Sequence, residues 1–86
     1  MDIDIVLPIH NERENLRPLL DEIEQALEPT GKSFEVIAVD DGSTDGSADL
    51  LRDLAIEKPY LHVILFRQNY GQSAAFDAGF RASTAN

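Results

Sequence analysis

The 86-residue sequence contains no cysteine and only two histidines, His10 and His62. The lack of cysteine excludes a disulfide framework and a thiolate metal site, and it agrees with a reducing, cytosolic setting. Two histidines are too few for a histidine-rich metal site. The chain also lacks any run of about 18 apolar residues, so the sequence predicts no membrane-spanning segment. Its first residues have neither the basic flank nor the long apolar core of a signal peptide.

Positive charge is scarce as well. The 7 Lys and Arg residues stand against 16 Asp and Glu residues, which gives a net charge of −9. Because phosphate backbones attract clustered Lys and Arg, this balance argues against nucleic acid as a partner. A phosphorylated ligand would need a divalent cation or an ordered set of backbone amides to offset the charge. The length allows one small domain, which is marginally stable when it stands alone.

The segment from Val36 to Ser47 organises the rest of the chain. It begins with the apolar run VIAV, typical of a strand buried on both faces, and then changes abruptly at Asp40 and Asp41 to acids and turn residues. A buried parallel strand that opens into such a loop before a helix is where α/β proteins bind ligands. We expect both carboxylates to stand at the carboxyl edge of the sheet, free of the core, with a functional role for at least one. Capping of the next helix accounts for Ser43 and Asp45.

Apolar segments predict three strands, at residues 3–7, 34–39 and 61–66, the first of them ended by Pro8. Helical periodicity follows each strand, so the predicted order is β-α-β-α-β-α. Because crossovers between parallel strands are right-handed, this order predicts an α/β domain with a three-stranded parallel sheet and covering helices. We expect His62 to be a surface residue of the third strand and not a ligand.

The helices are predicted from the spacing of apolar residues and from the residues that typically start or end a helix. An Asn15 cap would place Pro18 in the first turn of the first helix, where its missing donor costs little, and Gly31 would end that segment. The second helix should stop near Pro59. The third helix carries a stripe of small residues that would let it lie close to the sheet: Ala74, Ala75, Ala78, Gly79 and Ala82.

All three strand-to-helix loops should lie on one edge of the sheet, at residues 8–12, 40–45 and 67–71. They carry three motifs, PIHNE at 8–12, VDDGSTD at 39–45 and NYGQ at 69–72. In this order and spacing the motifs resemble those of family 2 glycosyltransferases. The most similar branch is that of dolichyl-phosphate mannose synthase and the bacterial polyprenyl-phosphate sugar transferases. The resemblance covers all 86 residues.

The resemblance implies a three-layer, Rossmann-like βαβαβα arrangement with a parallel sheet in the order 3-2-1, the N-terminal portion of a GT-A fold. Residues 1–86 would then be the part of a glycosyltransferase domain that binds the nucleotide-sugar. By position, Pro8, His10 and Glu12 would cradle the base and ribose. Val39 and Asp41 would contact the nucleotide, with the Asp41 carboxylate accepting a hydrogen bond from a base N–H. Glu12 has a second interpretation, as a partner of the helix dipole in an early turn.

Two departures from the family pattern matter. The chain has His10 where the family commonly has tyrosine, and an imidazole still stacks on a base, more weakly. The family's metal-binding Asp-x-Asp would lie beyond Asn86, together with the catalytic base. We therefore expect no catalytic and no metal-binding residue in this chain, which by itself would be inactive. The full-length enzyme would use a divalent cation, Mg²⁺ or Mn²⁺.

The resemblance further implies transfer of a sugar from a UDP- or GDP-sugar to undecaprenyl or dolichyl phosphate, at the cytoplasmic face of the membrane, in building the cell envelope. The alternative is a stand-alone α/β binding or signalling module with an acidic pocket. Receiver domains, however, place their acidic pair after the first strand, and here the pair follows the second. Finally, the strand 3–7 would present an open apolar edge, which predicts a homodimer through that strand.

Overall fold

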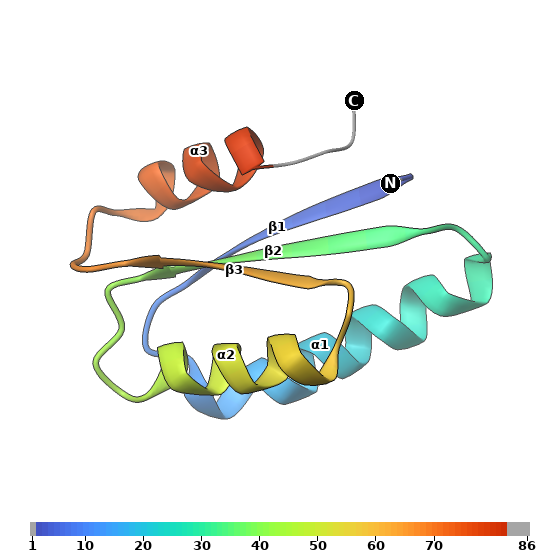
Figure 1. Ribbon diagram of the computed structural model, residues 1–86, viewed down its shortest axis with the longest axis horizontal. Coiled ribbons are helices and arrows are strands. Elements are labelled where there is room, and N and C mark those ends of the chain that lie inside the picture. Colours follow the sequence, from blue (N-terminus) through green and yellow to red (C-terminus); the bar gives the residue numbers. More distant parts are fainter. Residues whose placement is uncertain (1, 83–86) are drawn as a thin grey trace.

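One parallel sheet with helices on both faces makes up the fold (Figure 1). The computed structural model describes residues 2–82. In chain order its elements are β1 (Ile3–Ile9), α1 (Arg13–Leu27), the 3₁₀ turn η1 (Glu28–Thr30), β2 (Phe34–Asp41), α2 (Ser47–Glu57), β3 (Leu61–Phe66) and α3 (Gln72–Ala82). The predicted α/β class and βαβαβα order are confirmed.

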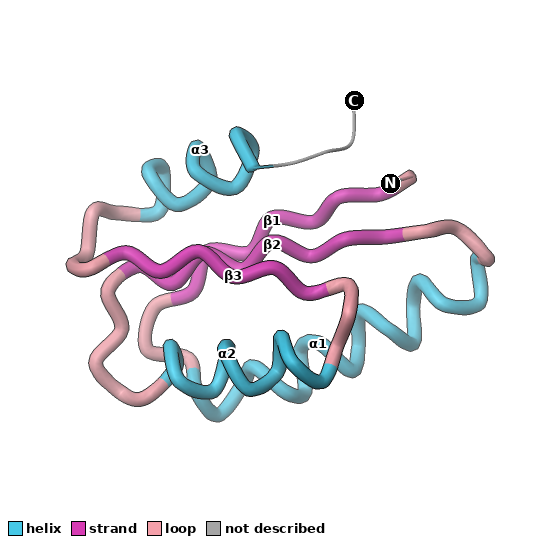
Figure 2. Tube along the Cα trace, in the orientation of Figure 1, coloured by secondary structure: helices cyan, strands magenta, loops and turns pink. Residues whose placement is uncertain are grey.

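The strands lie side by side in the order β1-β2-β3, which is the predicted 3-2-1 order read from the other edge. Ile3 pairs with Phe34 at the start of the β1–β2 register, and Val36 pairs with Leu61 at the start of the β2–β3 register. Helices α1 and α2 cover one face of the sheet and α3 covers the other (Figure 2). The chain therefore has three layers, with β2 at the centre.

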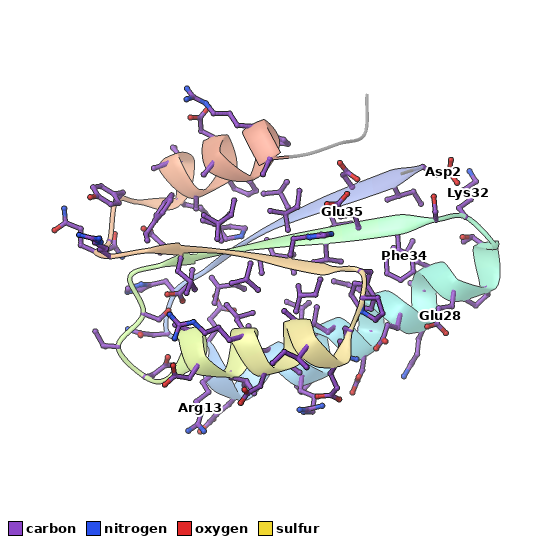
Figure 3. The ribbon with its side chains drawn as sticks, viewed as in Figure 1. Asp2, Arg13, Glu28, Lys32, Phe34 and Glu35 are labelled. Atoms are coloured by element: carbon purple, nitrogen blue, oxygen red, sulfur yellow. The ribbon has the colours of Figure 1, made fainter. Side chains whose placement is uncertain are left out.

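Alternation along β2 divides the core between the two faces, because successive side chains of a strand point in opposite directions. Phe34 and Glu35 illustrate this in Figure 3. Farther along, Val36 and Ala38 pack in the cluster under α1 and α2, which also contains Leu16, Leu20, Leu51 and Leu54. Ile37 and Val39 pack against Ala75 of α3.

Helix α3 lies close to the sheet, as its small residues predict. Gly79 is buried, and a β-carbon added to it would lie 3.2 Å from Cγ2 of Val6 and closer still to Cγ1. Real β-carbons do not approach their neighbours so closely, so only glycine allows this separation between α3 and β1.

Two predicted boundaries are wrong. Strand β1 continues through Pro8, which pairs with Val39 in register; β1 is an edge strand, where proline is tolerated. Helix α1 begins at Arg13 and not after Asn15, so Pro18 lies in its second turn. The Arg13 backbone N–H donates to the Asp45 carboxylate, and this bond from a distant loop supports the earlier start.

Two smaller predictions, for Gly31 and for the surface position of His62, are confirmed. Gly31 ends the first helical segment with a left-handed φ of 70°. His62 is at the surface, where its Nε2 lies 3.0 Å from Oε1 of the buried Glu35. No helix within residues 2–82 combines the length and apolarity needed to cross a membrane.

Candidate functional site

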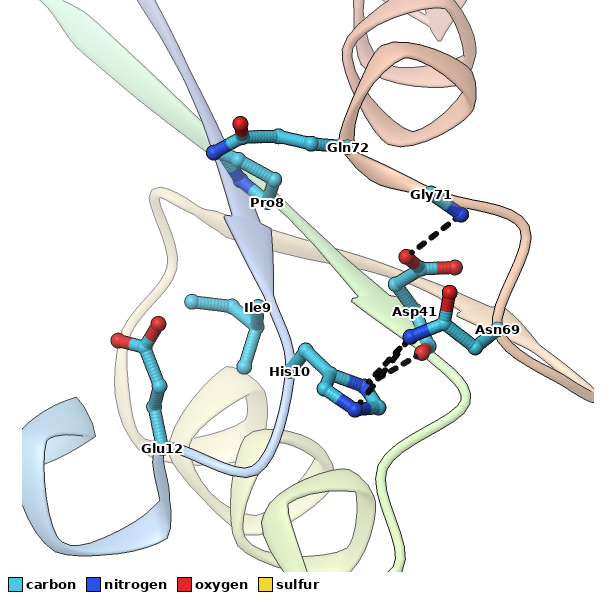
Figure 4. Close-up of a pocket in the computed structure, with 8 residues that line it drawn as sticks. All are labelled: Pro8, Ile9, His10, Glu12, Asp41, Asn69, Gly71 and Gln72. Atoms are coloured by element: carbon cyan, nitrogen blue, oxygen red, sulfur yellow. Dashed lines mark hydrogen bonds between the residues drawn. The ribbon is translucent and has the colours of Figure 1, made fainter.

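A pocket opens at the carboxyl edge of the sheet, where the loops after β1, β2 and β3 meet (Figure 4). Its volume is about 300 Å³. The polar lining comes from all three loops, and the full set of lining residues is Pro8, Ile9, His10, Glu12, Asp41, Asn69, Gly71 and Gln72.

Asp41, the last residue of β2, holds the loop that leads into α3. Its Oδ1 accepts the backbone N–H of Tyr70 at 2.7 Å, and its Oδ2 accepts that of Gly71 at 3.0 Å. The residue is only 4% exposed. A carboxylate oxygen has two acceptor positions, so each oxygen of Asp41 keeps one for a ligand. Asp41 is therefore both a structural anchor and a pocket residue.

Asp40 lies on the opposite face of β2 from Asp41, as the alternation of a strand requires. It is 2% exposed, and its Oδ2 accepts the backbone N–H of Ser43 at 3.2 Å. The expectation that both carboxylates stand free of the core is wrong. Each is buried and engaged by backbone donors, and only Asp41 lines the pocket.

His10 connects the three loops. Its Nδ1 lies 2.8 Å from the backbone carbonyl oxygen of Asp41. The side-chain nitrogen of Asn69 lies 3.2 Å from Nδ1 and 3.3 Å from Nε2, and that of Asn11 lies 3.5 Å from Nε2. The imidazole thus fills the junction between the end of β2 and the loops before α1 and α3.

Glu12 occupies the N-cap position of α1, but its side chain makes no capping hydrogen bond. Figure 4 shows its carboxylate on the far side of His10 from Asp41. The pocket therefore has an acidic group on each of two walls. The interpretation of Glu12 as a partner of the helix dipole remains compatible with this position.

Asp45 caps two helices at once. Its Oδ2 accepts the Arg13 N–H at the start of α1, and its Oδ1 accepts both the backbone N–H and the hydroxyl of Ser47 at the start of α2. The hydrogen bond from the Ser47 hydroxyl is the main cause that lowers the pKa of this carboxyl below its usual value of 3.8. Ser43 does not cap α2; its hydroxyl accepts the Asn11 N–H at 2.9 Å.

Gly42 allows the loop before α3 to lie directly against the end of β2. Its φ is +69°, and a β-carbon added there would lie 2.5 Å from the backbone nitrogen of Asn69. A side chain at this position would push the loop away and open the pocket wall.

The structure brings four of the five predicted site residues together: Pro8, His10, Glu12 and Asp41 line one pocket. It does not bring Val39 there, because that side chain is fully buried against α3. The sequence interpretation assigned no role to the remaining pocket residues, Ile9, Asn69, Gly71 and Gln72. The position of the third loop on the same sheet edge was the signal that could have found Asn69, Gly71 and Gln72. Within residues 2–82, no three His, Asp or Glu side chains gather closely enough to hold a metal ion.

Comparisons with known proteins bear on this pocket. The model of the family described as glycosyl transferase family 2 matches residues 4–86. The undecaprenyl-phosphate 4-deoxy-4-formamido-L-arabinose transferase of Aeromonas hydrophila subsp. hydrophila is 42% identical over 82 residues, which are 94% of this chain and 25% of that protein. The enzyme of the same name from Pseudomonas syringae pv. syringae is 48% identical over 80 residues, 91% of this chain and 23% of its own length.

The same resemblance holds in three dimensions. The mannosyltransferase PcManGT from Pyrobaculum calidifontis, solved in complex with GDP-Man and Mn²⁺, matches with a TM-score of 0.83 and 28% sequence identity. The match covers 96% of this chain and 24% of the mannosyltransferase. The chain thus spans about a quarter of the length of each of these relatives.

Proposed function

The chain belongs to glycosyltransferase family 2, and from this membership we propose that the edge pocket binds the nucleoside diphosphate part of a nucleotide-sugar donor. The observation that carries the proposal is the convergence of three loops, far apart in sequence, on one cavity of about 300 Å³. Small-molecule sites typically have this size and a few convergent polar groups, here Glu12, Asp41 and Asn69.

Each contact follows from the chemistry of the lining. The Asp41 carboxylate is held rigid by two backbone N–H groups, so it suits a base N–H as a fixed acceptor. Glu12 offers two oxygens to the two hydroxyl groups of a ribose. Pro8 and His10 give an apolar wall and a ring for the base. Val39, the register partner of Pro8, acts from the core by supporting Pro8 and Asp41.

We also propose that residues 1–86 are the donor-binding part of a longer enzyme that transfers a sugar to a polyprenyl phosphate at the cytoplasmic face of the membrane. The names of the undecaprenyl-phosphate transferases support the acceptor, and the GDP-Man complex of the mannosyltransferase supports the donor class. The acceptor is undecaprenyl or dolichyl phosphate, and both UDP- and GDP-sugars are candidate donors.

A divalent cation, Mg²⁺ or Mn²⁺, would offset the charge of a diphosphate on a chain whose net charge is −9. The Mn²⁺ of the mannosyltransferase complex supports such a requirement. The side chains within residues 2–82 do not fit a resident cation, because no three acidic or imidazole groups gather there. We therefore assign neither metal ligands nor catalytic residues to this chain.

Calorimetric titration of the 86-residue chain with GDP and with UDP tests the proposal. We expect weak, saturable binding of at least one of the two, and no transfer of sugar to a polyprenyl phosphate. Absence of binding by both, with circular dichroism showing a folded chain, would overturn the donor-binding function. Measurable sugar transfer by the purified chain would overturn its proposed lack of catalytic residues.

A partner of a different kind is a second copy of the chain. Within residues 2–82, β1 pairs with a strand on one side only, so no neighbouring strand covers its other edge. We propose that the 86-residue chain associates through this edge.

A further inference from the structure

The side chain of Glu12 is positioned by its backbone alone. Glu12 lines one wall of the edge pocket, but within residues 2–82 no hydrogen bond or ion pair engages its carboxylate. The carboxylate of Asp41, by contrast, is held directly by two backbone N–H groups. The direction in which Glu12 points therefore depends on the chain segment that carries it, residues 11–13.

Asn11 connects this segment to the loop before α2. Its backbone N–H donates to the hydroxyl oxygen of Ser43 at 2.9 Å, and its Oδ1 accepts the backbone N–H of Thr44 at 2.7 Å. The hydroxyl oxygen of Thr44 lies 3.5 Å from the same Oδ1. Because Asn11 and Thr44 are 33 positions apart in sequence, these contacts join two different loops. We call the contacts of Asn11 with Ser43 and Thr44 the Asn11 latch.

The backbone of Asn11 has an unusual conformation. Within residues 2–82 it is the one residue other than glycine with a positive φ, +51°. This left-handed conformation is unfavourable for most residues and less so for asparagine. Such conformations persist where surrounding contacts hold them, and they cluster at binding sites. Here the latch supplies the contacts. Both chain neighbours of Asn11, His10 and Glu12, line the edge pocket, whereas Asn11 does not.

Other hydrogen bonds fix the chain after Glu12. The Arg13 N–H donates to the Asp45 carboxylate at 3.2 Å, and the Asn15 N–H donates to the carbonyl oxygen of Glu12 at 2.9 Å. These two bonds define the start of α1. The direction from which the chain enters Glu12 is left to the conformation of Asn11, and therefore to the latch.

We propose that Asn11 is a positioning residue of the edge pocket, which sets the direction of the Glu12 carboxylate through the latch and does not touch the ligand. This inference rests on the proposed function, in which Glu12 binds the two hydroxyl groups of a ribose. Both carboxylate oxygens must face the diol, and binding groups keep such a geometry only when their supporting contacts hold them. Release of the latch therefore weakens binding although every group that meets the ligand is still present.

Three substitutions separate the latch from the backbone conformation. Asn11→Gly keeps the left-handed φ and removes Oδ1, and Asn11→Ala is incompatible with both. Asn11→Asp keeps an acceptor oxygen on a residue that tolerates this φ. We expect Asn11→Gly and Asn11→Ala to bind GDP or UDP, whichever the unchanged chain binds more tightly, roughly three- to tenfold more weakly. Asn11→Asp should bind nearly as tightly as the unchanged chain in salt that screens its added charge.

Asn15→Ala is the matched control, because Asn15 is an exposed amide close by in sequence that does not line the edge pocket. Its affinity for the nucleotide should be unchanged. An Asn11→Gly variant that binds like the unchanged chain, or equal losses in all three Asn11 variants, would overturn the role of the latch.

A double-mutant cycle shows whether the effect passes through Glu12. If Asn11 acts by positioning the Glu12 carboxylate, adding Asn11→Gly to Glu12→Ala should cause hardly any further loss of affinity. The melting temperature should still fall, because the contact with Thr44 is lost in either background. Losses of affinity that multiply would show that Asn11 does not act through Glu12, and would overturn its positioning role.

Hydrogen exchange without ligand separates this inference from the proposed function. The Thr44 N–H should exchange faster in Asn11→Gly than in the unchanged chain, whereas the N–H groups of Tyr70 and Gly71, which Asp41 accepts, should exchange as before. Unchanged exchange at Thr44 would overturn the latch even if nucleotides bind. If exchange responds but the unchanged chain binds neither GDP nor UDP, the proposed function fails and the positioning role of Asn11 fails with it.

Discussion

The Asp45 carboxylate accepts the backbone N–H of Arg13 at 3.2 Å, so a side chain in the loop before α2 completes the first turn of α1. The same carboxylate holds the start of α2 through Ser47. Since each helix begins directly after a pocket-forming loop, Asp45 fixes the loops after β1 and β2 relative to one another. It does so from outside the pocket, which it does not line.

We predict that Asp45→Asn lowers the melting temperature by a few degrees without abolishing nucleotide binding. Asparagine caps a single helix about as well as aspartate. Here, however, its NH₂ group would have to face either the Arg13 N–H or the donors of Ser47, so one of these hydrogen bonds would be lost. Thermal unfolding followed by circular dichroism measures the change. Asp49→Asn is the matched control, because Asp49 is exposed and forms an exposed ion pair with Arg52 one turn along α2. An equal effect of both substitutions would contradict the double cap.

The lowered pKa of Asp45 also predicts a pH dependence. A carboxyl whose pKa is lower in the folded chain contributes stability above the pKa of the unfolded chain, near 3.8, and loses it as the pH falls through the folded value. The melting temperature should therefore fall on acidification below about pH 4. Asp45→Asn should show a shallower fall over the same range. Parallel curves for the two chains would contradict the assignment of this titration to Asp45.

Asp41 should matter more for binding than Asp45. Asp41→Asn leaves one backbone N–H of Tyr70 or Gly71 facing an NH₂ group and removes a charged acceptor for the base. Loss of a hydrogen bond to a charged group should weaken nucleotide binding by about 1.5–3 kcal/mol. Calorimetric titration of Asp41→Asn and of Asp45→Asn with nucleotide, at a temperature where both variants are folded, compares their affinities. If Asp41→Asn and Asp45→Asn weaken binding equally, the role of Asp41 in reading the base is wrong.

Local sequence patterns were sufficient for the order of the elements and for the edge on which the loops meet. Strand β3 (Leu61–Phe66) and helix α3 (Gln72–Ala82) could be predicted from the spacing of their apolar residues. Residues close in sequence are sufficient to define both elements. The start of α1 depends on the hydrogen bond from the Arg13 N–H to Asp45, which is 32 positions away in sequence. No local sequence pattern predicts a hydrogen bond between residues so far apart. The sequence therefore placed the start of this helix too late.

The same limit applies to the pocket. The motifs placed Pro8, His10, Glu12 and Asp41 on the sheet edge where the pocket opens, since each lies at or just after the carboxyl end of a strand. The place of Asn69 in the pocket depends on two sets of non-local contacts: the approach of its loop to Gly42, and the hydrogen bonds that Tyr70 and Gly71 donate to Asp41. The burial of Asp40 was not predicted either. Two adjacent acids suggest an exposed loop, whereas in the structure both belong to β2 and their side chains point to opposite faces of the strand.

The contact between α3 and β1 predicts the effect of adding one methyl group. Gly79→Ala improves helix propensity by up to about 1 kcal/mol, but overpacking against Val6 should cost about 1–3 kcal/mol. We therefore expect a net loss of stability in urea unfolding. Val6→Ala makes room for the added methyl, so the double variant should lose less than the sum of the two single changes. Additive losses would show that the two side chains do not meet.

The last prediction concerns self-association of the 86-residue chain through the open edge of β1. The apolar side chains of this strand are half-buried, and the net charge of −9 opposes association more strongly at low salt, where charges are less screened. Light scattering over a roughly hundredfold concentration range should show a dimer that is favoured by added salt. A monomer under all these conditions would contradict the prediction.

A second exposed apolar surface allows the interface itself to be tested. On the outer face of α3, the rings of Phe76 and Phe80 stack at 6.2 Å, and Phe80 is 66% exposed. Because Phe80 lies outside the core, Phe80→Ser should leave the fold and a β1-mediated dimer intact. Hydrogen exchange should then slow in β1 as the concentration rises. Loss of the dimer in Phe80→Ser, with unchanged exchange in β1, would place the interface on α3 and refute association through the strand edge.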